Sequence, residues 1–170
     1  PNVGGHYEPQ HRRLMLYHGT YEPYETVFHE GTHQLVHFAT LIHGEAFSNS
    51  FWFQEGIACF FEAVKHGADG KWVVATLNRD RLMGIQQMIK MKREAPLEKL
   101  VKLRYGMVNL SGPSPGDKNA LDPAEWYAQS WSMIYFLRTY QNGKYKDKFD
   151  EYFKAEITGK GSYESFVHIV

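Results

Sequence analysis

The segment His29-Glu30-Gly31-Thr32-His33 constrains this chain more than any other part of the sequence. In an α-helix, residues four apart lie on one face about one turn apart, so the imidazoles of His29 and His33 can bind one metal ion. Glu30 lies roughly 100° around the helix from His29, within reach of a water bound to that ion. A zinc ion would lower the pKa of this water toward about 7, and Glu30 would then accept its proton. The segment therefore predicts a helix that carries a hydrolytic zinc site.

The expected helix spans residues 24–42. Apolar or small residues recur there at three- or four-residue spacing, as in an amphipathic helix: Phe28, Gly31, Leu35, Ala39 and Ile42. Such a stripe normally packs on the core, and the two histidines are expected to face away from it. Gly31 weakens the intrinsic helix propensity by about 1 kcal/mol relative to Ala, which suits a close approach of backbone or substrate, or simply tight packing.

A third ligand is expected at Glu55, within the segment Trp52–Ala58 that begins a second helix. One stripe of this helix is apolar (Phe53, Ile57, Phe60 and Val64), and another carries Glu55, Cys59, Glu62 and His66. Two histidines and one glutamate leave a fourth zinc position open to water, which is the arrangement of a catalytic site. Glu62 follows Glu55 by seven residues on the same face. It either accepts the second ring N–H of a ligand histidine or is a solvated helix charge.

The remaining histidines and the single cysteine fit ordinary roles better than ligation. His33 and His37 are also four residues apart, but no acid follows His33 directly, so this pairing would lose the general base. His37 is therefore interpreted as a residue just outside the ligand set or as a solvent-facing one. Cys59 has no partner for an intrachain disulfide, and its apolar neighbours indicate a small buried filler rather than a ligand. The other histidines belong to no ligand spacing and are expected at the surface or in ordinary hydrogen bonds: His6, His11, His18, His43, His66 and His168.

The two motifs together resemble the gluzincin metallopeptidases, especially their short, single-domain members. The resemblance rests on His-Glu-x-x-His at residues 29–33 and on Trp-x-x-Glu-Gly-x-Ala-x-x-x-Glu at residues 52–62. It implies a zincin-like fold with His29, His33 and Glu55 as zinc ligands and Glu30 as the general base.

A third segment, residues 124–130, is also similar to a downstream part of that family, in which a tyrosine often stabilises the oxyanion. This makes Tyr127 the candidate for that role, with Tyr105, Tyr135 and Tyr140 as alternatives. The 21 residues between His33 and Glu55 slightly exceed the spacing in the aminopeptidase branch. No glycine-and-acid exopeptidase signature is present, so an aminopeptidase is not predicted.

Length and composition agree with one catalytic domain. A chain of 170 residues buries about two-thirds of its unfolded surface and leaves no room for a second domain. Basic and acidic residues balance at 19 each, so no overall field attracts nucleic acid or an anionic membrane. No run of eighteen apolar residues exists, and no transmembrane helix is expected.

The rest of the chain is expected to be mostly helical. Residues 14–17 suggest a short strand; in zincins an edge strand at this place aligns the substrate by main-chain hydrogen bonds. Asp122 is a candidate N-cap, with Pro123 at the first helical position and Glu125 three residues after the cap. Helical patterns cover residues 71–92, 97–105, 122–141 and 144–155, a loop is expected at residues 106–121, and Ser162 is a candidate cap for a last helix.

We therefore expect a predominantly helical α+β fold with a small sheet near the N-terminus, forming one zincin-like catalytic domain over residues 1–170 of a longer chain. Its predicted activity is zinc-dependent hydrolysis of peptide bonds in a peptide or protein substrate. The alternative is a zinc-containing module of the same fold that binds peptides or partner proteins without turnover, because the loop at residues 106–121 or missing flanking sequence blocks the cleft. The intact Glu30 argues against this alternative.

A structural helical domain with a coincidental motif would require both motif halves to arise independently. The compartment stays open: the lack of paired cysteines fits the cytoplasm, whereas a removed targeting peptide would favour the bacterial envelope or secretion.

Overall fold

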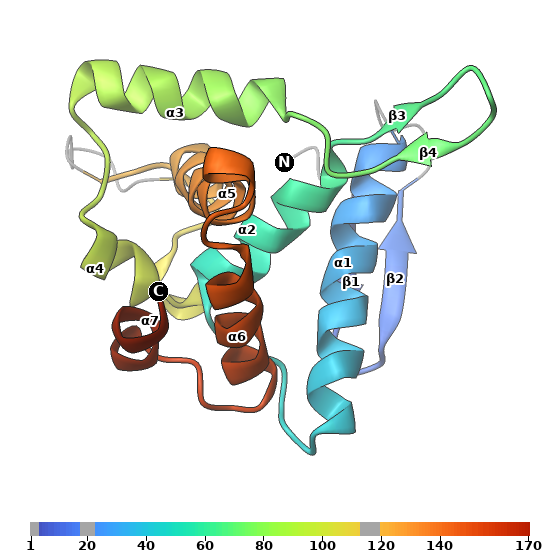
Figure 1. Cartoon of the computed structure of the whole chain (residues 1–170). Coiled ribbons are helices and arrows are strands. Elements are labelled where there is room, and N and C mark those ends of the chain that lie inside the picture. The colour runs from blue at the N-terminus through green and yellow to red at the C-terminus, as the bar shows by residue number, and fades with distance from the viewer. Residues whose placement is uncertain (1–3, 18–22, 113–119) are drawn as a thin grey trace.

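Helices dominate the computed structural model, which describes residues 4–17, 23–112 and 120–170 (Figure 1). In chain order the elements are β1 (Gly5–Glu8), β2 (Arg13–Leu16), α1 (Pro23–Ile42), α2 (Phe51–Glu62), β3 (Lys65–His66), β4 (Trp72–Val73), α3 (Arg79–Met91), α4 (Leu97–Val101), the 3-10 helix η1 (Tyr105–Met107), α5 (Pro123–Thr139), the 3-10 helix η2 (Tyr140–Asn142), α6 (Lys146–Ile157) and α7 (Tyr163–Ile169). The expected mainly helical α+β class, with a small antiparallel sheet near the N-terminus, is confirmed. None of the described helices combines the length and apolar character needed to cross a bilayer.

Helix α2 is the most buried element and lies between α1 and α5. Every residue from Phe51 to Phe60 is buried, so the predicted division into an apolar and a polar stripe understates how much of this helix is enclosed. The contact with α5 is close at Gly56, where a Cβ atom would lie 2.7 Å from both Ile134 Cγ1 and the carbonyl oxygen of Ser130. Glycine at this position therefore lets α2 and α5 pack together, and this packing fixes the position of Glu55.

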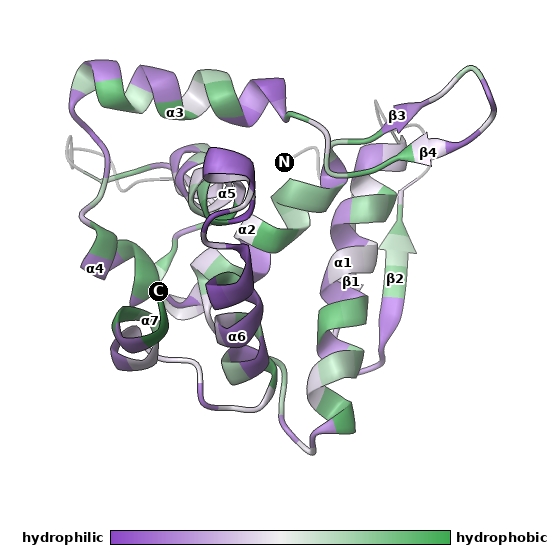
Figure 2. Ribbon diagram, viewed as in Figure 1, coloured by the Kyte–Doolittle hydropathy of each residue, from purple (hydrophilic) through white to green (hydrophobic). Residues whose placement is uncertain are grey.

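Helix α1 packs on α2 through the face that carries the histidines, and the predicted core stripe is wrong in this respect. Leu35 and Ile42 are 70% and 82% exposed. The buried side chains of α1 are instead Thr32, His33, Val36, His37 and Thr40. Polar side chains of α1 and α2 contact each other. The histidine face of α1 therefore faces α2, and apolar residues of α1 remain at the surface (Figure 2).

Three residues of the predicted stripe, Phe28, Gly31 and Leu35, line an open groove of about 580 Å³ together with Ile57, Phe61 and Phe153. Gly31 belongs to this groove rather than to the histidine face. Nothing lies within 4 Å of the place that a Cβ atom of Gly31 would take, so neither tight packing nor a close approach of another backbone segment is observed there.

Strands β1 and β2 form a hairpin that packs on α1. The predicted strand at residues 14–17 is observed as β2, in register with β1 from the pair Gly5 and Leu16 to the pair Glu8 and Arg13. The Tyr17 N–H donates to the Gly4 carbonyl on the side facing β2. Along an antiparallel strand, every second residue bonds the neighbouring strand with its main-chain groups, and the residues between them point these groups outward. Since Gly4 bonds toward β2, the main-chain groups of Gly5 and Tyr7 point away from β2. The free edge beside α1 therefore belongs to β1, which was not predicted from its polar sequence.

The predicted helix at residues 71–92 is shorter than expected. Its start forms β4, which pairs with β3, and α3 begins only after Asn78, whose side chain accepts a hydrogen bond from the Arg81 N–H. Trp72 packs instead against the rings of Tyr24 and Phe28, with centroid distances of 4.7 and 5.8 Å. The predicted helix at residues 97–105 is likewise reduced to α4 and the separate turn η1.

The C-terminal helices begin where their caps predict. Asp122 and Glu125 form a reciprocal capping box with Pro123 at the first position of α5, and Ser162 caps α7. Helix α5 ends at Thr139, and α6 covers residues 146–157, close to the predicted 144–155. Of the predicted loop at residues 106–121, residues 113–119 lie outside the described part of the chain.

Candidate metal centre

Three side chains from α1 and α2 meet at one point between these helices. His29 Nε2 lies 3.3 Å from His33 Nε2 and 3.2 Å from Glu55 Oε2, and His33 Nε2 lies 3.5 Å from the same Glu55 oxygen. The three atoms therefore form a nearly equilateral triangle. The structure brings together the three residues that the sequence proposes as ligands, which form a group able to hold a metal ion.

The size of this triangle matches the face of a tetrahedral zinc site. Zinc bonds of about 2.0–2.1 Å to nitrogen and oxygen place neighbouring ligand atoms about 3.3 Å apart in a tetrahedron. The other ring nitrogen of His29, Nδ1, lies 2.6 Å from Glu62 Oε2 and donates to it. In the neutral ring, the Nε2 lone pair then faces the Glu55 carboxylate. These acceptor atoms can remain so close only with a proton or a metal cation between them.

Without a metal, a proton on His29 supplies that positive charge. Burial disfavours the charged ring, but contacts with Cys59, Glu55 and Glu62 outweigh this effect and raise the pKa of His29 well above its ordinary value. Burial would also raise the pKa of Glu55, yet His33 and His29 hold it well below its usual range. Both shifts have one cause: the site holds two buried carboxylates and requires a cationic group between them.

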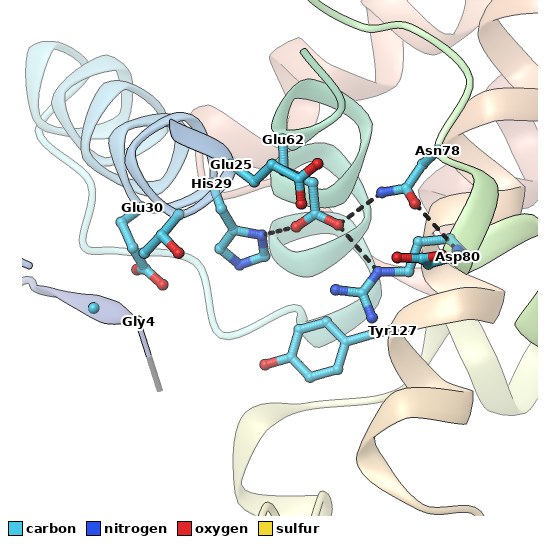
Figure 3. Close-up of a pocket in the computed structure, with 11 residues that line it drawn as sticks. Gly4, Glu25, His29, Glu30, Glu62, Asn78, Asp80 and Tyr127 are labelled. Carbon is cyan, nitrogen blue, oxygen red and sulfur yellow. Dashed lines mark hydrogen bonds and ion pairs between the residues drawn. The ribbon is translucent and has the colours of Figure 1, made fainter. Parts of the chain in front are cut away.

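Glu62 is held in place from both sides. Its Oε1 atom accepts a hydrogen bond from Asn78 Nδ2 at 2.8 Å and an ion-paired one from Arg81 Nε at 3.1 Å, while Oε2 accepts from His29 (Figure 3). Burial alone would raise the pKa of Glu62, but His29 and Arg81 lower it to about 2. The carboxylate is therefore charged and oriented, and it fixes which nitrogen of His29 is available to a metal.

Glu55 is oriented by a hydrogen bond from a tyrosine. Tyr105 in η1 donates its hydroxyl to Glu55 Oε1 at 2.5 Å, which leaves Oε2 for the triangle. Burial and the neighbouring Glu55 raise the pKa of Tyr105 well above its ordinary value, so the hydroxyl keeps its proton. This interaction differs from the oxyanion role for which the sequence offered Tyr105 as an alternative.

His29 also belongs to a second group of possible metal ligands, together with Cys59 and Glu62. In this group His29 would bind through Nδ1. Cys59 is fully buried, as expected, and its thiol contacts His29. However, the 2.6 Å separation of Nδ1 and Glu62 Oε2 is a short hydrogen bond, and it is too small for two ligands of one tetrahedral ion. The geometry therefore favours the triangle of His29, His33 and Glu55 as the metal site.

The Glu30 side chain is half-buried and points toward β1. One carboxylate oxygen, Oε2, accepts a hydrogen bond of 2.8 Å from the main-chain N–H of Tyr7. Tyr7 is 8% exposed, and its hydroxyl shares a hydrogen bond of 2.8 Å with Nδ1 of His37. His37 is thus buried and paired, so the solvent-facing reading of this residue is wrong.

Tyr127 enters the site from α5. Its ring centroid lies 6.3 Å from that of His29, and the Arg81 guanidinium carbon lies 5.2 Å from the Tyr127 ring centroid. In Figure 3 its hydroxyl points toward the side on which Glu30 lies. Burial and nearby Glu55 raise the pKa of Tyr127 well above its ordinary value, so the phenol is neutral and can donate a hydrogen bond. The two other tyrosines considered for this role, Tyr135 and Tyr140, line neither hollow of the cleft.

A cleft crosses the triangle as two adjoining hollows of about 440 and 530 Å³. Both are lined by Gly5, His29, Glu30 and Tyr127, so they meet at the candidate metal site. The smaller hollow is polar and ends at Glu62, Asn78, Asp80 and Arg81. The larger one is more aromatic and includes Tyr7, Phe47, Tyr105, Leu110 and Pro123. Strand β1 borders both, so an extended ligand can lie along its free edge.

Sequence reasoning identified the ligand triangle, Glu30, Glu62 and Tyr127 as the candidate set, and the structure brings all six residues to this cleft. It missed the residues that hold them: Tyr7, Asn78 and Arg81 were not singled out, and His37 and Tyr105 received other interpretations. Tyr7 lies 23 residues from Glu30, and Arg81 lies 19 residues from Glu62, so these contacts form only through folding. No spacing rule relates such positions.

A family described as "Protein of unknown function (DUF1570)" has a model that matches residues 24–156, which is more than half of the chain. The matched span contains α1, α2 and α5, and with them all six candidate residues. No curated protein and no solved structure matches the chain significantly.

Proposed function

The chain belongs to the family described as "Protein of unknown function (DUF1570)", and we propose that it is a zinc-dependent metallopeptidase with a zincin-like fold of the gluzincin type. The observation that carries this proposal is the triangle of His29 Nε2, His33 Nε2 and Glu55 Oε2, with separations of 3.2–3.5 Å. Three protein ligands at a solvent-accessible cleft leave a fourth position for water, as in catalytic zinc sites.

The proposed ligands are His29, His33 and Glu55. When bound there, zinc supplies Lewis acidity, which lowers the pKa of a coordinated water toward about 7 and polarises a carbonyl. Glu62 keeps the proton of His29 on Nδ1, so that Nε2 presents its lone pair. Tyr105 holds Glu55 so that Oε2 faces the histidines.

Glu30 is the proposed general base. Its carboxylate lines both hollows and adjoins His29 along α1, so it can accept the proton of the attacking water and later return it to the leaving amine. The Tyr127 hydroxyl is the proposed donor to the oxyanion of the tetrahedral intermediate. A peptide in extended form fits the cleft, because β1 offers a free edge along it.

Replacing Glu30 with Gln tests this function. The variant should bind zinc as the wild type does, because Glu30 is not a ligand, and it should lose peptide cleavage by at least about 10²-fold. Zinc content is measured by elemental analysis, and cleavage by mass spectrometry of a mixed peptide pool with and without a chelator. Glu98→Gln removes an exposed carboxylate of α4 that lines neither hollow of the cleft, and this variant should cleave normally.

Undiminished cleavage by the Glu30→Gln variant would contradict the assigned base. If the wild type binds zinc and peptides but cleaves none of the pool, the alternative of a peptide- or partner-binding module replaces the enzyme. If purified wild-type protein binds no zinc at all, both are wrong.

A further inference from the structure

We propose that His37 and Tyr7 are positioning residues for the general base: the His37 ring holds the Tyr7 side chain, and the Tyr7 main-chain N–H holds the Glu30 carboxylate. The inference rests on the proposed function for its catalytic consequence. The two hydrogen bonds themselves can be measured on the protein without zinc and without any peptide cleavage.

One residue makes both contacts with α1, the first through its main-chain N–H and the second through its side-chain hydroxyl. Tyr7 lies on β1, and its N–H points away from β2 and donates to Glu30 Oε2 at 2.8 Å. The Tyr7 side chain reaches along α1 to His37, two helical turns beyond Glu30, where it forms the second 2.8 Å hydrogen bond. Strand β1 is thus fixed at two points of the same helix.

Burial makes the pair specific rather than incidental. Tyr7 and His37 are 8% and 6% exposed, and Phe47 packs against both rings at centroid distances of 6.4 and 5.3 Å. A buried hydroxyl or ring nitrogen without a partner costs free energy, so each group depends on the other. Rotation of the Tyr7 ring away from His37 would leave both unpaired, and the rigid ring keeps the β1 backbone in place.

Small displacements of a base matter for catalysis. A misplacement of about 1 Å in a reacting group can lower a rate by about 10²-fold. Since the N–H of Tyr7 is bonded to Glu30, the remaining outward main-chain groups of β1, on Gly5 and the Tyr7 carbonyl, are those left for substrate. The same edge of β1 therefore holds the Glu30 carboxylate and offers its other main-chain groups to a peptide.

The hairpin offers a matched control for this pair. Tyr17 and His6 form a second tyrosine-histidine hydrogen bond of 3.1 Å, but they are exposed and do not contact Glu30. Tyr7→Phe removes only the hydroxyl that His37 binds, while the ring and the main-chain N–H remain. Tyr17→Phe removes the corresponding hydroxyl from the exposed pair.

The first measurement is amide hydrogen exchange at residue 7 in the metal-free protein, followed by NMR. We expect Tyr7→Phe and His37→Leu to lower the protection of this amide by about tenfold or more, whereas Tyr17→Phe leaves it unchanged. His37→Gln should restore most of the protection, because an amide side chain can either donate to or accept from the Tyr7 hydroxyl. Unchanged protection in both Tyr7→Phe and His37→Leu would overturn the proposal.

The second measurement is peptide cleavage by the zinc-loaded variants. Tyr7→Phe and His37→Leu should lower kcat about tenfold with little change in KM and with full zinc content, and His37→Gln should recover the rate. A loss of zinc, or a change confined to KM, would overturn the positioning role. If the wild type itself cleaves no peptide, the proposed function fails while the exchange experiment still decides whether the pair holds Glu30.

Discussion

Two tyrosines approach the candidate metal site, and their hydroxyls have different surroundings. The Tyr105 hydroxyl is bound to Glu55 Oε1, so it is engaged in holding a ligand. The Tyr127 hydroxyl points toward the side of the cleft on which Glu30 lies, and the Arg81 guanidinium lies over the Tyr127 ring. At the scale of single residues, the proposed function therefore gives Tyr105 a role in holding a metal ligand and leaves the Tyr127 hydroxyl available to a substrate.

Replacing each tyrosine with Phe separates these roles, since both rings stay packed. Tyr127→Phe should keep zinc affinity and lower kcat by about 10²-fold, the typical effect of removing one oxyanion donor. Tyr105→Phe should weaken zinc binding by about tenfold or more, because the partner of a ligand is lost. Chelator competition gives the affinity and steady-state kinetics gives kcat. The reverse pattern would exchange the two assignments.

At the scale of elements, two glycines in the metal-site motifs have opposite surroundings. Gly56 on α2 faces α5, where a Cβ atom would lie 2.7 Å from Ile134 and from the Ser130 carbonyl oxygen. Gly31 on α1 faces an open groove with nothing within 4 Å. Only the first glycine is required by packing.

Alanine at each position should therefore shift stability in opposite directions. Gly56→Ala should destabilise the chain by about 1–3 kcal/mol, because α2 must move away from α5. Gly31→Ala should stabilise it by up to about 1 kcal/mol, because Ala favours a helix interior. Urea unfolding monitored by circular dichroism measures both free energies. A stabilising Gly56→Ala would mean that α2 and α5 are not in close contact there.

The element scale also shows what the sequence could reveal. Spacing located helices α1 and α2, the pairing of His29 with His33, and the capped starts of α5 and α7, because these features are local. Glu55 was proposed as the third ligand from its place in a second helix and from the family resemblance. It assigned the wrong buried face to α1, because Leu35 and Ile42 follow a helical period whether or not a neighbour covers them. It extended a helix over Trp72, whose partners Tyr24 and Phe28 are distant in the sequence. Pairings such as Tyr7 with His37 depend on tertiary contacts and carry no local signal.

At the scale of the whole molecule, the candidate metal site joins two helices. His29 and His33 come from α1 and Glu55 comes from α2, and this contact buries polar groups rather than an apolar stripe. The interface holds the carboxylates of Glu55 and Glu62, which help to raise the pKa of His29 well above its ordinary value. A bound ion would therefore link α1 to the α2 and α5 core.

Zinc removal should lower global stability for this reason. A ligand that binds only the folded state at 100 times its Kd adds about 2.7 kcal/mol, which corresponds to roughly 5–10 °C in Tm for a chain of this size. Thermal unfolding of wild-type protein with excess zinc and with chelator measures the shift. His33→Ala should abolish it, and an equal shift in His33→Ala would show that zinc stabilises the chain from another site.

The central claim, that one ion is held by His29, His33 and Glu55, is tested most directly by X-ray absorption at the zinc edge on wild-type protein with one equivalent of zinc. The account predicts nitrogen and oxygen neighbours at about 2.0–2.2 Å, with outer-shell scattering from two imidazoles and no sulfur. A sulfur neighbour at about 2.3 Å would place the ion on Cys59 instead and contradict the claim, as would the scattering of only one imidazole.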